Sequence, residues 1–152
     1  MSELATLSAT EMLMQKAHIE TMERALLEAP QVECPVTHRF APGLYIREIF
    51  VPAGAVIVGH EHKAETLNIL LQGAALVAHD GKVEEMVAPL TFNSAPGVRK
   101  AAVVLDDMVW INVHPNPTNE TDPAKLEEMF IVKSDAFLEV QRQLELLKEA
   151  RK

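Results

Sequence analysis

The feature that most constrains the fold is a succession of short β-prone runs, separated by turn residues, between Leu44 and Ile131. The strongest turn signal is Asp80-Gly81, because the tight turn of a hairpin needs residues that tolerate positive φ. Many short strands at this spacing predict a β-sandwich or barrel. The expected strands are Leu44–Val51, Ala55–His62, Thr66–Leu71, Ala75–His79, Lys82–Val87, Leu90–Phe92, Lys100–Leu105 and Met108–His114.

A helix is expected at the N-terminal end. Ser8 followed by Glu11 is a capping-box pattern, and Pro30 ends the helical stretch, so the prediction covers residues 8–29. Its apolar residues recur at helical spacing and form one face. They are Met12, Ile19, Met22, Leu26 and Ala29.

Two helices are expected at the C-terminal end. Asp122 followed by Pro123 predicts the N-cap and the first helical position of one. The other is expected to begin at Ser134 and to run to the end of the chain. It carries a narrow apolar stripe, which is expected to pack on the barrel or on a sister subunit. The stripe consists of Phe137, Val140, Leu144 and Leu147.

These elements divide the chain into three parts within the length of a single domain. Residues 1–42 form the N-terminal helix and a connector, with a short extended piece around Val36–Phe40. Residues 43–115 form the barrel, and residues 116–152 form a helical tail. The predicted fold class is therefore mainly β, with helices at both ends.

Composition narrows the range of partners. The formal net charge of −8 argues against a general binder of nucleic acids or anionic membranes, which would carry a basic surface. Cys34 is the single cysteine, so no internal disulfide is possible and a reducing compartment is expected. No apolar run approaches the roughly 18 residues of a membrane span. We expect a cytoplasmic protein without a membrane partner.

The segment between Gly54 and Gly73 reads GAVIVGHEHKAETLNILLQG. It resembles the first motif of the cupin family, in which a glycine, His-x-His, a glutamate and a second glycine follow at fixed spacing. The segment APGVRK, which ends at Lys100, resembles in outline the second cupin motif, a Pro-Gly turn followed by a histidine. The resemblance covers about half of the chain. It implies a small jelly-roll barrel with an interior metal site.

The sequence departs from this pattern at two of the metal-ligand positions. Thr66 stands where the family has its glutamate, with Glu65 one residue early, and Lys100 stands where the last histidine belongs. Glu65 could reach inward from a loop between strands, but not from a regular strand, because a shift of one residue turns a side chain to the opposite face. The family's metal role is therefore carried over only to His60 and His62.

Alternation along the strands predicts which side chains face the interior. If His60 and His62 point inward, Val56 and Val58 do so as well. Buried polar groups without partners cost about 1–3 kcal/mol each, so many together predict a wet pocket. The polar or amphipathic side chains expected inside are His60, His62, Thr66, Asn68, Lys100, Trp110, Asn112 and His114.

Three classes of function remain open. The first is a non-catalytic barrel that binds a small anionic metabolite or a nucleotide-like molecule. Its expected binding residues are Thr66, Asn68, Arg99, Lys100, Trp110 and Asn112. The second is a metal-dependent enzyme of the dioxygenase or isomerase type. It would hold one divalent transition metal with His60, His62 and His114. The third is a structural subunit of an oligomer.

The binding protein is the favoured class. A protonated Lys100 about 4 Å from a divalent cation would repel that cation by several kcal/mol at an effective dielectric constant of about 20. The family resemblance also implies a homodimer or a higher homo-oligomer. The segment WINVHPNPTNETDPAKLEEMFI, from Trp110 to Ile131, is similar to small uncharacterised cupin-like proteins of phages and prophages. That similarity implies a phage accessory role, such as sequestering a small molecule.

Overall fold

The computed structural model describes residues 16–79 and 81–151, so residues 8–15 of the predicted N-terminal helix lie outside it. The described helices are α2 (Lys16–Glu28), α3 (Pro123–Phe130) and α4 (Asp135–Ala150). The described strands are β1 (Val36–Ala41), β2 (Leu44–Val51), β3 (Val56–Val58), β4 (Glu61–His62), β5 (Thr66–His79), β6 (Lys82–Val87), β7 (Leu90–Ser94), β8 (Ala101–Pro115) and β9 (Ile131–Val132).

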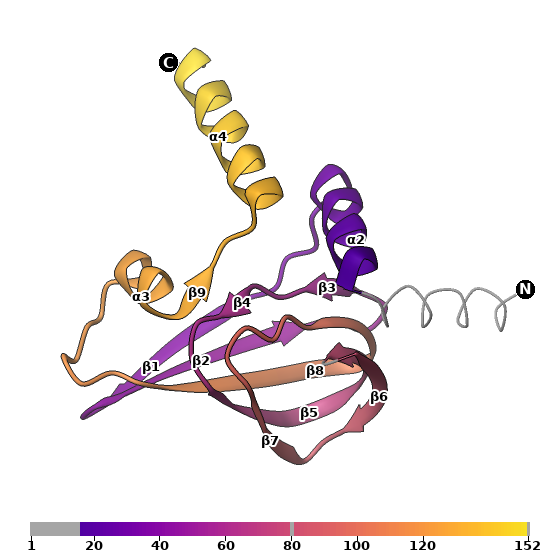
Figure 1. Cartoon of the computed structure of the whole chain (residues 1–152), viewed down its shortest axis with the longest axis vertical. Coiled ribbons are helices and arrows are strands. Elements are labelled where there is room, and N and C mark those ends of the chain that lie inside the picture. The colour runs from indigo at the N-terminus through magenta and orange to yellow at the C-terminus, as the bar shows by residue number, and fades with distance from the viewer. Residues whose placement is uncertain (1–15, 80, 152) are drawn as a thin grey trace, which may run out of the picture.

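One antiparallel sheet makes up the barrel (Figure 1). Its strands follow the order β1-β2-β8-β5-β6, while β3 adds to β8 and β7 adds to β5. The long strands β5 and β8 each pair with several neighbours, which curls the sheet around a closed interior. A separate two-stranded pair joins β4 to β9, and so attaches the C-terminal tail to the barrel.

Most of the predicted strands are confirmed, with three differences in their extent. Strands β5 and β8 are each one continuous strand where the sequence suggested two, because their turn-like residues form bulges instead of turns. The expected strand Ala55–His62 is broken into β3 and β4. The extended piece near Val36–Phe40 is β1, which pairs with β2, so the sheet begins before residue 43.

The bulge at Gly73 reverses the side-chain alternation of β5. Register shifts occur on both sides of this residue, which lies at a φ of 90°. Before the bulge Leu70 faces the interior core, and after it Ala75 and Val77 do so, although these residues differ in parity. A bulge inserts one unpaired residue, which explains the change. Both halves of the long strand therefore contribute to one core.

Two apolar clusters lie on opposite sides of the sheet. The interior cluster contains Leu70, Val104 and Met108, all nearly inaccessible to solvent, with Trp110 beside them. The outer cluster lies beneath α2, where Ile19 packs against Ala78 and Ala101. The helix α2 thus covers the outer face of the barrel wall.

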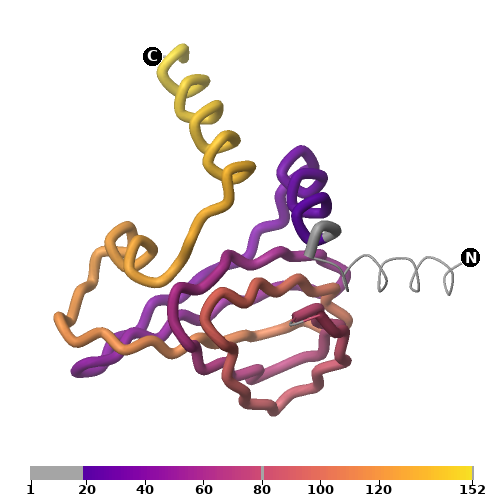
Figure 2. Tube along the Cα trace, in the orientation of Figure 1, coloured from indigo at the N-terminus to yellow at the C-terminus, as the bar shows by residue number. Residues whose placement is uncertain are grey.

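Both C-terminal helices begin where the sequence predicts. Asp122 accepts a hydrogen bond from the Ala124 amide, and Ser134 accepts one from the Phe137 amide, so each is an N-cap. The helix α4 then extends away from the barrel (Figure 2). Its stripe meets the barrel at its first residue, where the Phe137 ring contacts the His60 ring, while its last two residues are exposed. Leu144 and Leu147 are 52% and 61% exposed. The alternative that the stripe packs on a sister subunit, and with it the homo-oligomer, stays a prediction.

No helix within residues 16–79 and 81–151 combines the length and the apolar character that a membrane span requires.

Gly73→Ala is expected to destabilise the fold strongly. A Cβ at this position would lie 2.4 Å from the carbonyl oxygen of Asp107, in addition to the cost of a positive φ. We expect a loss of about 3 kcal/mol or more in the free energy of unfolding, measured by urea denaturation. Gly54→Ala is the control, because its φ is 87° but a Cβ there meets no atom within 4 Å. Equal losses in the two variants would contradict the close approach at Gly73.

Candidate functional site

The interior face of the barrel carries a cross-strand row of polar side chains at one end. Arg47 on β2 pairs with Asn112 on β8, which in turn pairs with Asn68 on β5. One step further along, Tyr45 pairs with His114. Directly paired residues share a face, so these side chains all point the same way. Arg47 and Tyr45 were not anticipated from the sequence. They alternate along β2, so that Arg47 lies opposite Asn112 and Tyr45 opposite His114.

His62 and Lys100 complete this end of the barrel. The rings of His62 and His114 meet edge to face, with centroids 5.6 Å apart. The charges of Lys100 and Arg47 both act on His62. Lys100 precedes Ala102 and Val104, which face the interior core, and alternation gives it the same side. We call Arg47, His62, Lys100 and His114 the inner cluster.

His60 lies beside the C-terminal tail. Its ring contacts the Phe137 ring edge to face at 4.7 Å, and it lies in the field of Glu23 and Arg99. The expectation that His60 and His62 share the interior with Val56 and Val58 is not met, because the strand breaks between β3 and β4. Val58 packs in the outer cluster, and the break at Gly59 resets the alternation.

Asn68 is the centre of a hydrogen-bond network inside the barrel. Its side chain is fully buried, and its amide nitrogen donates to Ser94 Oγ at 2.6 Å. Its amide oxygen accepts hydrogen bonds from Asn112 Nδ2 at 2.7 Å and from Trp110 Nε1 at 3.1 Å. Thr66, also buried, donates to the carbonyl of Ala64. The hydrogen bonds of the four residues expected to bind ligand are therefore made within this network or to the main chain. These residues are Thr66, Asn68, Trp110 and Asn112, and their direct contact with a ligand stays a prediction.

Arg99, also expected to bind an anion, already has an anionic partner. Its guanidinium forms an ion pair with Glu23 of α2, and its Nε donates to the Gly59 carbonyl at 2.8 Å. Ser134 Oγ donates to the other oxygen of the same carboxylate at 2.6 Å. Burial raises the pKa of Glu23, but the hydrogen bonds from Arg99 and Ser134 outweigh it and leave the pKa below its ordinary value. The charge of Arg99 is thus neutralised within the chain.

The inner cluster is cationic, and none of the described carboxylates forms an ion pair with its Arg47 or Lys100. Burial lowers the pKa of Lys100 to about 8, so its amine remains mostly protonated at neutral pH. Burial, then the charge of Lys100, lowers the pKa of His62 to about 4. Burial, then the charge of Arg47, lowers the pKa of His114 to about 4. Among the residues that the structure describes, no carboxylate contributes to any of these shifts or pairs with Arg47 or Lys100.

Two buried imidazole nitrogens also lack partners. The Nδ1 atoms of His60 and His62 are inaccessible to solvent, and no described residue forms a hydrogen bond with them. A buried polar atom without a partner costs about 1–3 kcal/mol, which indicates that another group completes these contacts.

The residues present do not fit the metal site of the cupin motif. His62 and His114 come together, but His60 is turned toward Phe137, and Lys100 places an ammonium group beside His62. Glu65 lies in the loop before β5, is exposed and accepts a hydrogen bond from Asn93. Within the described ranges, no three side chains of His, Cys, Asp or Glu gather closely enough for one ion.

A surface hollow of about 350 Å³ lies away from the inner cluster. It is lined by Phe40, Ala41, Pro42, Asn116, Asn119 and Thr121, at the turn between β1 and β2. The hydrogen bond from the Gly43 amide to Asn119 Oδ1 at 2.8 Å ties this turn to the start of the tail. Asn116 is likewise bonded to the main chain of Glu120. None of the residues expected to bind ligand or metal lines this hollow, so it does not correspond to the expected interior pocket.

No model of a protein family matches this chain, and neither does any curated protein. Solved structures do match it. KdgF from Halomonas sp. is 20% identical over 57% of this chain and 85% of its own, with a TM-score of 0.48. An RmlC-like cupin from Shewanella frigidimarina is 22% identical over 59% of this chain and 81% of its own, with a TM-score of 0.49.

Salicylate 1,2-dioxygenase from Pseudoaminobacter salicylatoxidans is similar over a longer part of this chain. The two share 14% identity, and the match covers 76% of this chain and 36% of the dioxygenase, with a TM-score of 0.54. At such identities the likeness concerns the fold alone. The cupin-type barrel expected from the sequence is confirmed.

The buried Lys100 is expected to make stability depend on pH. The unfolded lysine titrates near 10.4 and the folded one near 8, so between these values the unfolded chain binds more protons and stability rises with pH. Below pH 8 Lys100 is protonated in both the folded and the unfolded state, so the loss of stability caused by burying its charge no longer changes with pH. Lys100→Met should therefore be more stable at pH 7, by about 2–3 kcal/mol, with the difference shrinking toward pH 10.

The measurement is urea denaturation between pH 7 and pH 10. Lys125→Met is the control, because it removes the same charge from a side chain that is 69% exposed. A Lys100→Met variant that gains nothing at pH 7, or whose gain does not change with pH, would contradict the burial of the ammonium group.

Proposed function

We propose that this cupin-fold protein binds one small anionic molecule at the inner cluster and does not turn it over. The observation that carries the proposal is the presence of two cations, Arg47 and Lys100, on the interior side of the barrel without a described carboxylate partner. Charged groups are rarely buried without a partner, because desolvation is costly. An anion bound from solution would supply the missing counter-charge.

The chemistry of the inner cluster fits a carboxylate or a phosphate. An arginine offers a planar fork of donors for two oxygens, and a lysine adds a compact positive charge. His62 and His114, neutral at pH 7 because their pKa values lie near 4, can each donate one further hydrogen bond. A barrel of this size holds one small ligand and excludes a polymer. Nucleotide-like molecules belong to the same class through their phosphate groups.

The overall negative charge of the chain favours binding of an anion at the inner cluster over binding at the outer surface. The formal net charge is −8, so the outer surface repels anions on average. A cationic interior within an acidic protein favours anions small enough to enter the barrel. Sequestration of such a molecule, the role implied by the similarity to phage proteins, requires binding alone.

The test combines native mass spectrometry with calorimetric titration. We expect a small anion to co-purify, or the protein to bind at least one of phosphate, succinate and AMP. Arg47→Met and Lys100→Met should each weaken that binding by roughly 10- to 100-fold, because each removes a hydrogen bond to a charged group. Arg24→Met and Lys125→Met are controls that remove the same charge from exposed positions.

Three results would contradict the proposal. One is the absence of any co-purified anion together with no binding of the three probes. Another is an equal loss of affinity in the interior variants and their controls, which would indicate a general effect of charge. The third is about one tightly held transition metal per chain in elemental analysis, which would favour the metal-dependent enzyme.

A further inference from the structure

We propose that residues 130–137 form a strap that closes the mouth of the barrel over the histidines, and that Glu23, Arg99 and Ser134 form a latch that holds the strap closed. The strap runs from the end of α3 through β9 to the first turn of α4.

Each histidine of the candidate site has a strap residue against it. The Phe130 ring stacks on the His114 ring, with centroids 4.3 Å apart and planes 17° apart. Ile131 on β9 pairs with His62 on β4. The Phe137 ring meets the His60 ring edge to face at 4.7 Å. The strap therefore contacts the rings of His60 and His114 and pairs along the main chain with His62.

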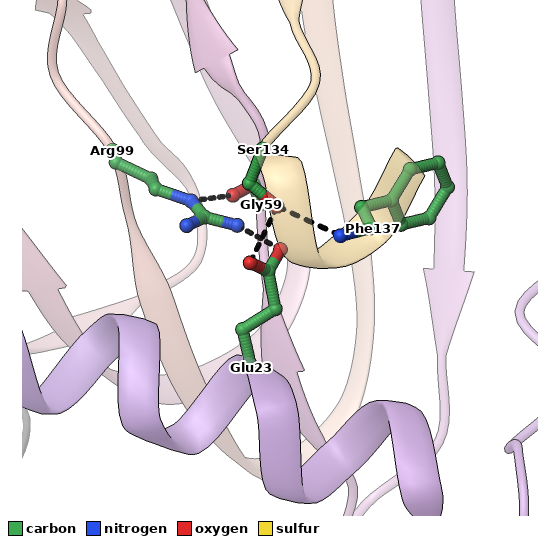
Figure 3. Close-up of polar contacts among 5 residues, drawn as sticks. All are labelled: Glu23, Gly59, Arg99, Ser134 and Phe137. Carbon is green, nitrogen blue, oxygen red and sulfur yellow. Dashed lines mark hydrogen bonds and ion pairs between the residues drawn. The ribbon is translucent and has the colours of Figure 1, made fainter. Parts of the chain in front are cut away.

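The latch joins three distant parts of the chain at one carboxylate (Figure 3). Glu23 comes from α2, Arg99 from the loop before β8, and Ser134 from the start of α4. Both Glu23 oxygens are used, one by Arg99 and the other by Ser134 Oγ. The side chains of Glu23 and Arg99 are 7% and 10% exposed, so water competes little for these bonds. The hydrogen bond from Arg99 to the Gly59 carbonyl fixes the latch to the barrel wall.

The strap is built to open without unfolding the barrel. Among the described strands, its ladder is the two-residue pairing of β4 with β9. At its N-terminal side Leu126, almost fully buried, anchors α3, whereas α4 on the other side has no buried residue to hold it. Segments with few buried apolar contacts open at lower free energy than the core. The latch ties the strap to α2 through the bond from Ser134 to Glu23, which is shielded from water. The other polar ties of the strap are the hydrogen bond from the Lys63 amide to the Phe130 carbonyl and the more exposed ion pair between Lys133 and Glu127 of α3.

Opening of the strap would expose the inner cluster, so this device would control how fast a ligand enters and leaves. That consequence rests on the proposed function. The strap itself does not, because its opening is measurable without any ligand. Diethyl pyrocarbonate acylates accessible neutral imidazoles, and its rate of reaction at each histidine can be followed by mass spectrometry.

Glu23→Ala removes the latch from the side of α2 and leaves the N-cap of α4 intact. We expect acylation of His60 and His62 to become about tenfold faster, because a hydrogen bond to a charged group is lost. His79, on the far part of β5, should react at an unchanged rate. Glu23→Gln, which keeps an acceptor for Ser134, should have a smaller effect, and Glu20→Ala, exposed on the same helix, should have none.

Unchanged rates at His60 and His62 in Glu23→Ala would overturn the latch, and an equal rise at His79 would indicate general unfolding and overturn it as well. If Glu23→Ala does not fold, hydrogen exchange of the unmodified protein decides. The amides of residues 130–137 and of Lys63 should exchange together and well before those of β5 and β8. Exchange of the strap only at the rate of the barrel would contradict the proposal.

Discussion

The register of β8 against its neighbours is the constraint on which the site depends. This strand pairs with β2, β3 and β5, so a shift of one residue would turn its whole interior set outward. In the observed register, Met108 and Trp110 complete the apolar core, while Asn112 and His114 continue the same face into the polar end. One alternating strand therefore carries both the packing that stabilises the barrel and the groups that give it chemistry.

The polar end of the barrel contains two kinds of interior polar group, which differ in whether their hydrogen bonds and charges are compensated within the chain. Asn68 and its partners form a closed set, since the amide of one residue satisfies donors from β8 and an acceptor from β7. Such a set fixes the strands relative to one another and leaves little capacity for a ligand. Arg47 and Lys100 are the opposite case, because both extend from interior positions and no described carboxylate pairs with them. Under the proposed function a bound anion would offset the cost of these charges, since a ligand that binds the folded state stabilises it.

The sequence predicted those features that local chemistry determines. The helix starts at Asp122 and Ser134, the strand β2 and the cupin-type barrel all follow from short patterns. It did not predict features that depend on distant partners. Arg99 appeared to be a free cation, because its partner Glu23 lies 76 residues away in the sequence. The bulge at Gly73 resembled a turn, since a glycine at positive φ serves both.

The misplacement of His60 has a similar physical origin. Alternation predicts a shared face only within an unbroken strand, and Gly59 interrupts the strand between Val58 and His60. The motif therefore identified these histidines, while the structure brings the rings of His62 and His114 into contact and places the ring of His60 against Phe137. Arg47 was missed because the motif does not include β2, and only the pairing with Asn112 shows its direction.

The most direct test of the account is the titration of Lys100 itself, followed by NMR of protein labelled at the lysine side chains, with and without a bound anion. The account predicts that Lys100 titrates near pH 8 in the free protein and at a clearly higher pH when phosphate or another bound anion is present. A Lys100 that titrates near the ordinary lysine value, and that does not respond to any anion the protein binds, would contradict it.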